Sequence, residues 1–266
     1  MKLSSVNETL FIPLLAKADM SSKNLFIKDS KAQEIISQID YDFKQLKQSK
    51  WLSMFLSLRA FIMDDLVNNF LESHDNVSIV HLGCGLDSRC LRVNSSYKKF
   101  YDVDYKSVID IRKEFYQVNN KYQMLGYSVS DFSWIKQIDK TDTILIVAEG
   151  LTMYLTDKEL TDLLLSISKN FNNVHLIFDA YSKKGVRLSK IKNPVNKLGA
   201  KITYGFNKPE DFLKLNNDLE YINTHLIKKS DNELKGMTKF IFNCLYCGKV
   251  AQSIYKIYEF SLKGDL

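Results

Sequence analysis

The chain has 266 residues, of which 45% are hydrophobic and 26% charged, and its formal net charge is +6. These values exclude a largely disordered chain and suit one domain with embellishments. The N-terminus lacks the features of a signal peptide, no apolar run reaches the roughly 18 residues that span a bilayer, and four cysteines indicate a reducing compartment. We therefore predict a cytoplasmic enzyme with no membrane partner.

The first part of the chain carries a helical pattern. Apolar residues recur at three- and four-residue spacing, which predicts helices over residues 10–20, 32–39 and 51–71. In the third helix, Arg59 lies on the same stripe as the apolar Phe55 and Ile62. An arginine on an apolar stripe needs an anionic partner or a route to solvent. Arg59 is therefore either structural, in an ion pair or at the helix edge, or a clamp for the carboxylate of a ligand.

A glycine turn follows the first predicted strand, at residues 79–82. Gly83 and Gly85 stand one residue apart, and two glycines at this spacing let the backbone turn sharply and lie close to a ligand. About twenty residues later a second predicted strand, at residues 99–104, ends in Asp104. A glycine turn, a crossover helix and an acidic strand end form the arrangement that binds an adenosyl ribose in doubly wound α/β folds.

Three more predicted strands alternate with helices, at residues 123–129, 143–148 and 174–178. Acids stand at or just after the ends of four of the five strands: Asp104, Asp131, Glu149 and Asp179. Because parallel strands end at one edge of the sheet, where ligands bind, these acids indicate a polar ligand there. Each acid alone could instead cap the helix that follows it.

The composition changes after residue 180. Residues 181–209 contain eight lysines and arginines and no acid, with apolar residues between them. We interpret this segment as a lid over the substrate cleft, with an anion-recruiting surface and a solvated face as alternatives. Two further strands are predicted, at residues 219–227 and 254–262, and the period-two pattern of the second suits an antiparallel edge strand.

The predicted fold is therefore α/β, with a doubly wound, Rossmann-like, seven-stranded and mostly parallel sheet. We expect one domain, in which N-terminal helices (1–75) precede a cofactor-binding core (76–180). A basic lid (181–208) then leads to C-terminal helices and antiparallel edge strands (209–266).

The glycine turn also discriminates between cofactors. Ser88 replaces the third glycine that nicotinamide and flavin dinucleotides need, and no Gly-Lys-Ser/Thr follows for a nucleoside triphosphate. S-adenosylmethionine has no phosphate and needs only backbone approach, a ribose acid and partners for its adenine and carboxylate. The sequence supplies all of these, which favours S-adenosylmethionine.

Successive motifs now resemble one family. Val80-His-Leu-Gly-Cys-Gly-Leu-Asp-Ser-Arg89, Val103-Asp104, Asp131 followed by Trp134, and Ala148-Glu-Gly-Leu-Thr-Met-Tyr-Leu155 are similar to the motifs of the leucine carboxyl methyltransferase family, which includes O-methyltransferases of polyketide pathways. The likeness runs in order from about residue 17 to residue 179. One departure is Lys106, where the family usually has a proline.

The resemblance implies a class I methyltransferase fold that binds S-adenosylmethionine and releases S-adenosylhomocysteine. It assigns Gly83 to the methionine part of the cofactor and Asp104 to the ribose, and we expect Gly85 of the same turn to bind the cofactor too. By the same resemblance, Arg59 pairs with the cofactor carboxylate, and Lys17 has a similar role. The adenine would lie at Asp131 and Phe132, with Glu149 beside the nucleoside.

The expected reaction is in-line methyl transfer to a carboxylate or hydroxyl oxygen of a small molecule. A carboxylate needs no general base, whereas an alcohol would benefit from one. Tyr154 and Arg187 are candidates for substrate contacts, and we assign no catalytic residue. Cys244 and Cys247 lack a second ligand pair, so we predict no metal site. Alternatives are a protein carboxyl or RNA methyltransferase that uses the basic segment, or a non-catalytic relative; we do not favour nucleic acid as a partner.

Overall fold

The computed structural model describes residues 5–139, 143–190, 201–228 and 234–264. The strands are β1 (Val77–Leu82), β2 (Lys99–Asp104), β3 (Tyr122–Gly126), β4 (Thr143–Ala148), β5 (Asn173–Tyr181), β6 (Leu219–His225) and β7 (Tyr255–Lys263). The α-helices are α1 (Phe11–Ser22), α2 (Ser30–Gln38), α3 (Lys50–Ser73), α4 (Arg89–Arg92), α5 (Lys106–Arg112), α6 (Asp157–Ser168), α7 (Lys183–Ser189), α9 (Pro209–Leu213), α10 (Gly236–Phe242) and α11 (Lys249–Gln252). Short 3-10 helices cover Ser5–Leu10, Phe43–Leu46, Phe132–Gln137 and Thr152–Tyr154, and a π-helix covers Asn243–Cys247.

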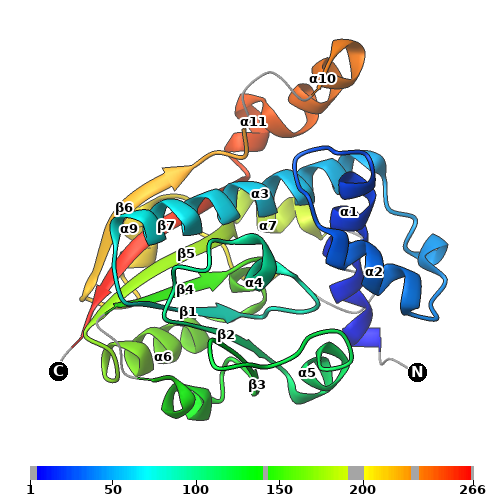
Figure 1. The fold of residues 1–266 in the computed structure, drawn as a ribbon. Coiled ribbons are helices and arrows are strands. Elements are labelled where there is room, and N and C mark those ends of the chain that lie inside the picture. Colours follow the sequence, from blue (N-terminus) through cyan, green and yellow to red (C-terminus); the bar gives the residue numbers. More distant parts are fainter. Residues whose placement is uncertain (1–4, 140–142, 191–200, 229–233, 265–266) are drawn as a thin grey trace.

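One seven-stranded sheet crosses the molecule in the order β3-β2-β1-β4-β5-β7-β6 (Figure 1). The first five strands are parallel, and β7 is antiparallel to both β5 and β6. The predicted fold class is thereby confirmed. The order changes direction at β1 and β4, which is where an open sheet of this kind forms its ligand crevice.

The prediction that the strand at residues 254–262 lies at the sheet edge is wrong. β7 lies between β5 and β6, and β6 is the edge strand. The alternation of polar and apolar residues in this strand suggested one solvent-exposed face. Its polar Glu259 is instead bonded within the sheet, because His175 of β5 contacts it at 2.8 Å and His225 of β6 also bonds to it. A polar residue can occupy an interior strand when its neighbours satisfy it in this way.

Two hydrophobic cores lie on opposite faces of the sheet. Successive side chains of a strand point to opposite faces, so Ile79 of β1 packs with α1 and α3, whereas Val80 packs on the other face with α6. All six residues of β1 and of β4 are buried, as expected for parallel strands covered on both sides. Helix α6 begins with a capping box, in which Thr156 and Glu159 bond each other reciprocally.

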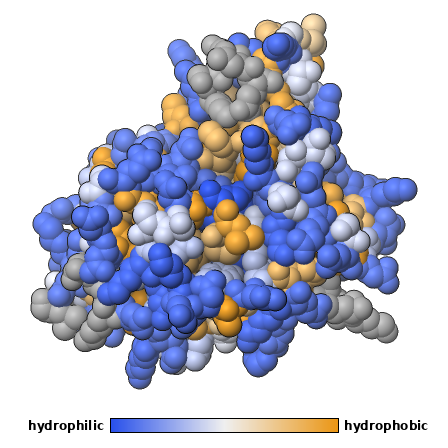
Figure 2. Space-filling model, viewed as in Figure 1, coloured by the Kyte–Doolittle hydropathy of each residue, from blue (hydrophilic) through white to orange (hydrophobic). Residues whose placement is uncertain are grey.

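The part of the chain from α10 to α11 projects beyond the sheet (Figure 1). In this part of the chain, α10 is followed directly by the π-helix. Phe242 is buried against Phe26, whereas Met237 and Phe240 are 71% and 65% exposed. Hydrophobic residues accordingly show at this projection in Figure 2, where most of the remaining surface is hydrophilic. Among the described helices, none combines the length and the apolar character needed to cross a membrane.

Candidate active site

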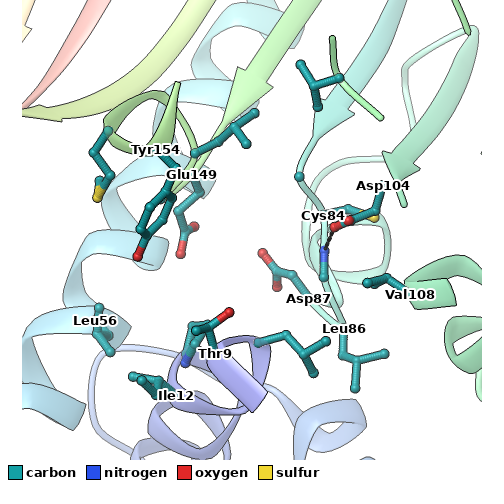
Figure 3. Close-up of a pocket in the computed structure, with 18 of the residues that line it drawn as sticks. Thr9, Ile12, Leu56, Cys84, Leu86, Asp87, Asp104, Val108, Glu149 and Tyr154 are labelled. Atoms are coloured by element: carbon teal, nitrogen blue, oxygen red, sulfur yellow. Dashed lines mark hydrogen bonds between the residues drawn. The ribbon is translucent and has the colours of Figure 1, made fainter. Parts of the chain in front are cut away.

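A cavity of about 570 Å³ lies at the carboxyl ends of β1, β2 and β4. Helices α1 and α3 form its opposite wall, so segments far apart in the sequence enclose it (Figure 3). Of the residues predicted to form the site, seven line this cavity: Lys17, Arg59, Gly83, Gly85, Asp104, Glu149 and Tyr154. Their roles stay predictions, but the structure brings them together.

The glycine turn is fixed on both sides. Gly83 and Gly85 have φ angles of 65° and 52°, in the left-handed region that other residues avoid. A Cβ on Gly83 would lie 3.1 Å from the side chain of Leu151. The Gly85 amide donates to Asp104 Oδ2 at 2.8 Å, and Arg112 Nη1 donates to the Gly85 carbonyl at 3.1 Å. The turn therefore faces the cavity with little freedom to move.

Asp104 is held with two acceptor positions free. Its Oδ1 accepts the Tyr105 amide at 2.7 Å, and its Oδ2 accepts the Gly85 amide. Each carboxylate oxygen can accept about two hydrogen bonds, so two positions are left for a ligand in the cavity. Burial raises the pKa of Asp104, and the two backbone amides oppose that effect only in part. Such a carboxylate gains by accepting hydroxyl donors, as a ribose would provide.

Arg59 is bound to two acids and a tyrosine. Its Nη2 donates to Glu149 Oε1 at 2.7 Å, and its Nη1 lies 3.0 Å from Asp179 Oδ2 and 2.8 Å from the Tyr255 hydroxyl. The structural ion pair is therefore present. Arg59 Nε is buried without a hydrogen-bond partner. Its role as a carboxylate clamp stays a prediction.

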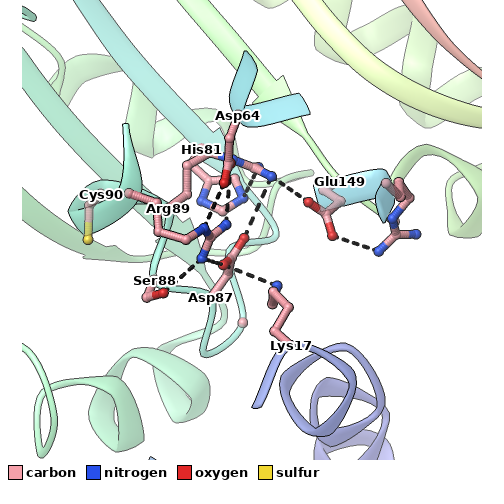
Figure 4. Close-up of polar contacts among 12 residues, drawn as sticks. Lys17, Asp64, His81, Asp87, Ser88, Arg89, Cys90 and Glu149 are labelled. Carbon is pink, nitrogen blue, oxygen red and sulfur yellow. Dashed lines mark hydrogen bonds and ion pairs between the residues drawn. The ribbon is translucent and has the colours of Figure 1, made fainter. Parts of the chain in front are cut away.

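A buried ion-pair network continues from Glu149 to α1 (Figure 4). Arg89 bonds Glu149 Oε2 and also donates to Asp64 Oδ1 at 2.7 Å. Lys17 lies 3.1 Å from Asp87 Oδ1, and both side chains are almost fully buried. Asp87 and Arg89 were not among the predicted site residues, although both follow the glycine turn within four residues.

The network keeps its acids ionised. Burial by itself would raise the pKa of Glu149, but Arg59, Lys17 and Arg89 outweigh it and hold that pKa well below its ordinary value. Arg92, Lys17 and Arg89 likewise lower the pKa of Asp87 against the effect of burial. One oxygen of Asp87, Oδ2, is buried without a hydrogen-bond partner. It lies 3.7 Å from Arg89 Nη2, so it still belongs to the ion-pair network.

His81 has a fixed tautomer behind the glycine turn. Arg89 Nη1 lies 3.1 Å from His81 Nε2, and a guanidinium can only donate, so Nε2 accepts. His81 Nδ1 therefore carries the hydrogen and donates it to Asp102 Oδ1 at 3.0 Å. Both ring nitrogens are occupied, which leaves His81 no site for taking a proton from a substrate.

Three predicted site residues lie outside the lining of the cavity. Asp131 is exposed and caps the 3-10 helix Phe132–Gln137 by accepting the Ser133 amide. Phe132 begins that helix, and the neighbouring segment 128–130 lines the cavity instead. Arg187 belongs to α7, and of the basic segment it is Lys201 that lines the cavity. Lys192 and Lys197 lie outside the described residues.

The phenol of Tyr154 points into the cavity opposite the glycine turn (Figure 3). Burial raises its pKa to about 12, and Arg59 nearby opposes that rise. Tyr154 therefore stays protonated at neutral pH, and its hydroxyl can donate a hydrogen bond but cannot act as a base.

Comparison with known proteins places the chain in a family. The model of the leucine carboxyl methyltransferase family matches residues 13–168. The chain is 30% identical over 210 residues to the tetracenomycin polyketide synthesis O-methyltransferase TcmP of Streptomyces glaucescens, covering 78% of each chain. It is 28% identical to the S-adenosyl-L-methionine-dependent methyltransferase dpfgK of Gibberella zeae, over 79% of this chain and 78% of the relative.

Solved structures of other methyltransferases with low sequence identity share this fold. A crystal structure of magnesium protoporphyrin IX methyltransferase (ChlM) from Synechocystis with bound S-adenosylhomocysteine superposes with a TM-score of 0.51, at 12% identity, over 94% of this chain and 99% of that chain. At this identity the likeness shows the fold alone. The family match and the relatives carry the assignment: the chain belongs to the leucine carboxyl methyltransferase family, and the prediction of a methyltransferase that uses S-adenosylmethionine is confirmed.

Proposed function

We propose that the chain methylates the carboxylate of a small, largely apolar molecule. S-adenosylmethionine supplies an already activated methyl group, so the protein has to bind, orient and exclude water. Both relatives are methyltransferases, and TcmP is named as an O-methyltransferase of polyketide synthesis. The cavity fits this class of acceptor because apolar side chains of α1 and α3, such as Ile12, Phe55 and Leu56, form much of its wall.

Two charged residues of the cavity wall support the binding of an amino-acid head group. The guanidinium of Arg59 suits a carboxylate, and the carboxylate of Asp87 suits an ammonium. Both residues line the cavity, and Arg59 is paired directly with Glu149. Asp104 would accept the ribose hydroxyls, and the turn at Gly83 and Gly85 would let the backbone lie against the sulfur-bearing chain.

The lack of a free base favours a carboxylate over an alcohol or phenol. Among the described residues of the cavity wall, Glu149 and Asp87 are held ionised by cations, and both nitrogens of His81 are occupied. Glu159 also lines the cavity, and the hydrogen bond from the Thr156 amide lowers its pKa. Tyr154 has a raised pKa, and Asp104 lies on the glycine-turn side of the cavity. An alcohol needs a group to take its proton, whereas a carboxylic acid arrives ionised at neutral pH. This observation carries the proposal.

The test compares matched acceptors. The purified chain is incubated with methyl-labelled S-adenosylmethionine and either 2-naphthoic acid or 2-naphthol, and the products are identified by mass. We expect a methyl ester, which base hydrolyses, from the acid and no methyl ether from the phenol. Ether formation without ester formation would overturn the proposal. Binding of S-adenosylhomocysteine without either product, across a wider panel of acids and phenols, would indicate a non-catalytic relative.

A further inference from the structure

Lys201 differs from the other cations of the cavity wall. Lys17 is paired with Asp87, and Arg59 is paired with Glu149 and Asp179. Among the described residues that line the cavity, Lys201 is the cation that has no acidic partner. We propose that Lys201 determines acceptor specificity by binding an anionic group of the acceptor other than the methylated oxygen. This inference rests on the proposed function and identifies the acceptor as an apolar molecule with two acidic groups.

The backbone around Lys201 is fixed to the cavity wall. The amides of Thr203 and Tyr204 both donate to the Met153 carbonyl, at 2.9 and 3.1 Å. Ile202 is 4% exposed and Tyr204 is 5% exposed, so apolar packing anchors the segment on both sides of these bonds. Met153 precedes Tyr154, whose phenol points into the cavity. Lys201 is therefore attached to the same wall as Tyr154, although its own side chain is exposed.

The charge of the segment that carries Lys201 favours an anion at this position. Residues 181–209 include no acid, and the basic side chains of α7 belong to the same segment. On the cavity wall, Asp104 belongs to the glycine-turn side and Glu159 is bonded to Thr156. An exposed cation at the rim of an apolar cavity raises the local concentration of anionic ligands and helps to orient them.

The chemistry of methyl transfer argues against the reacting carboxylate as the partner of Lys201. That carboxylate loses its negative charge as the new bond to the methyl group forms. A lysine bonded to it would stabilise the bound acceptor more than the transition state and would slow the reaction. Asp104 would hold the ribose and Arg59 the carboxylate of the cofactor, and both residues line the cavity, so the methyl group would be supplied inside the cavity. An exposed lysine at the rim instead suits a second, non-reacting acidic group.

The experiment measures binding to the enzyme saturated with S-adenosylhomocysteine, so that turnover is not needed. The probes are naphthalene-2,6-dicarboxylate and 2-naphthoate, which share an apolar body and differ in the second carboxylate. In the wild type we expect the dicarboxylate to bind up to about fivefold more tightly, the upper end of the range for an exposed ion pair. The preference should vanish in Lys201→Met and reverse in Lys201→Glu.

Lys184→Met is the matched control, because Lys184 is an exposed lysine of the same basic segment that does not line the cavity. This variant should keep the wild-type preference. The inference is overturned if the wild type binds both probes equally, or if Lys201→Met retains the preference. Ester formation is assayed separately: its failure, with the binding preference intact, counts against the proposed function and not against the role of Lys201.

Discussion

Replacing Asp104 by alanine should weaken the binding of S-adenosylhomocysteine while leaving the fold intact. In the structure, Asp104 accepts one hydrogen bond from each of two backbone amides, which leaves two acceptor positions for the ribose hydroxyls. A hydrogen bond to a charged group contributes about 1.5–3 kcal/mol, and 1.4 kcal/mol corresponds to a tenfold change in affinity. Losing one ribose bond should therefore raise the dissociation constant about tenfold, and losing both about 100-fold.

The assay is calorimetric titration with S-adenosylhomocysteine, with thermal unfolding measured on the same samples. Asp110→Ala is the matched control, because Asp110 is an exposed aspartate of α5 that pairs only with Lys106 at 2.6 Å on the surface. The control should bind as the wild type does. Unchanged affinity in Asp104→Ala, with a wild-type melting temperature, would refute the assignment of Asp104 to the ribose. A large loss of stability in the absence of ligand would instead show that Asp104 chiefly holds the turn.

Three further predictions concern stability. Gly83→Ala forces a left-handed backbone on alanine and places its Cβ 3.1 Å from Leu151. We therefore expect the free energy of unfolding to fall by at least about 1–2 kcal/mol, as measured by thermal or urea unfolding. An unfolding midpoint equal to that of the wild type would contradict this. Thr156→Ala removes the capping box of α6 and should lower stability by about 1 kcal/mol, whereas Thr161→Ala in the same helix should have a smaller effect. Burial would raise the pKa of Glu259, but bonds from His175 and His225 lower it to about 2 from 4.5. The stability that this carboxylate contributes is therefore complete above pH 4.5 and is lost as the pH falls toward 2. The melting temperatures of the wild type and Glu259→Gln should converge over that range. A difference in melting temperature that stays constant with pH would exclude this role.

Local signals in the sequence predicted most of the fold. Each of the seven strands follows from an apolar run or an alternating run, and residues such as Asp29 and Thr156 mark helix starts because capping is a contact between near neighbours in the chain. The position of β7 could not be predicted in this way. β7 pairs along its length with both β5 and β6, and histidines of these two strands bond Glu259. Such contacts join segments far apart in the chain, so a local sequence pattern does not reveal them.

Site residues that belong to a motif within one segment were predicted from the sequence. Site residues whose role depends on partners in other segments were missed. The glycine turn and Asp104 can be recognised from their spacing alone. Asp87 and Arg89 follow the turn closely in the sequence. Their part in the site depends on ion pairs with Lys17 and Glu149, which lie far away in the sequence. The basic segment indicated an anion near the cleft, yet which of its cations reaches the cavity depends on bonds to Met153, which favour Lys201 over Arg187.

The interior position of β7 also constrains how the chain folds as it is synthesised. The strands β1 to β5 have all been synthesised once residue 181 is reached, so a sheet of five parallel strands can begin to form before β6 and β7 exist. Yet Tyr255 of β7 supplies the hydroxyl that bonds both Arg59 and Asp179. Until it arrives, Arg59 has one partner fewer and the exposed edge of β5 is open to pairing with other chains. Slow synthesis between residues 181 and 255 should therefore favour aggregation, and fast synthesis should favour the native sheet.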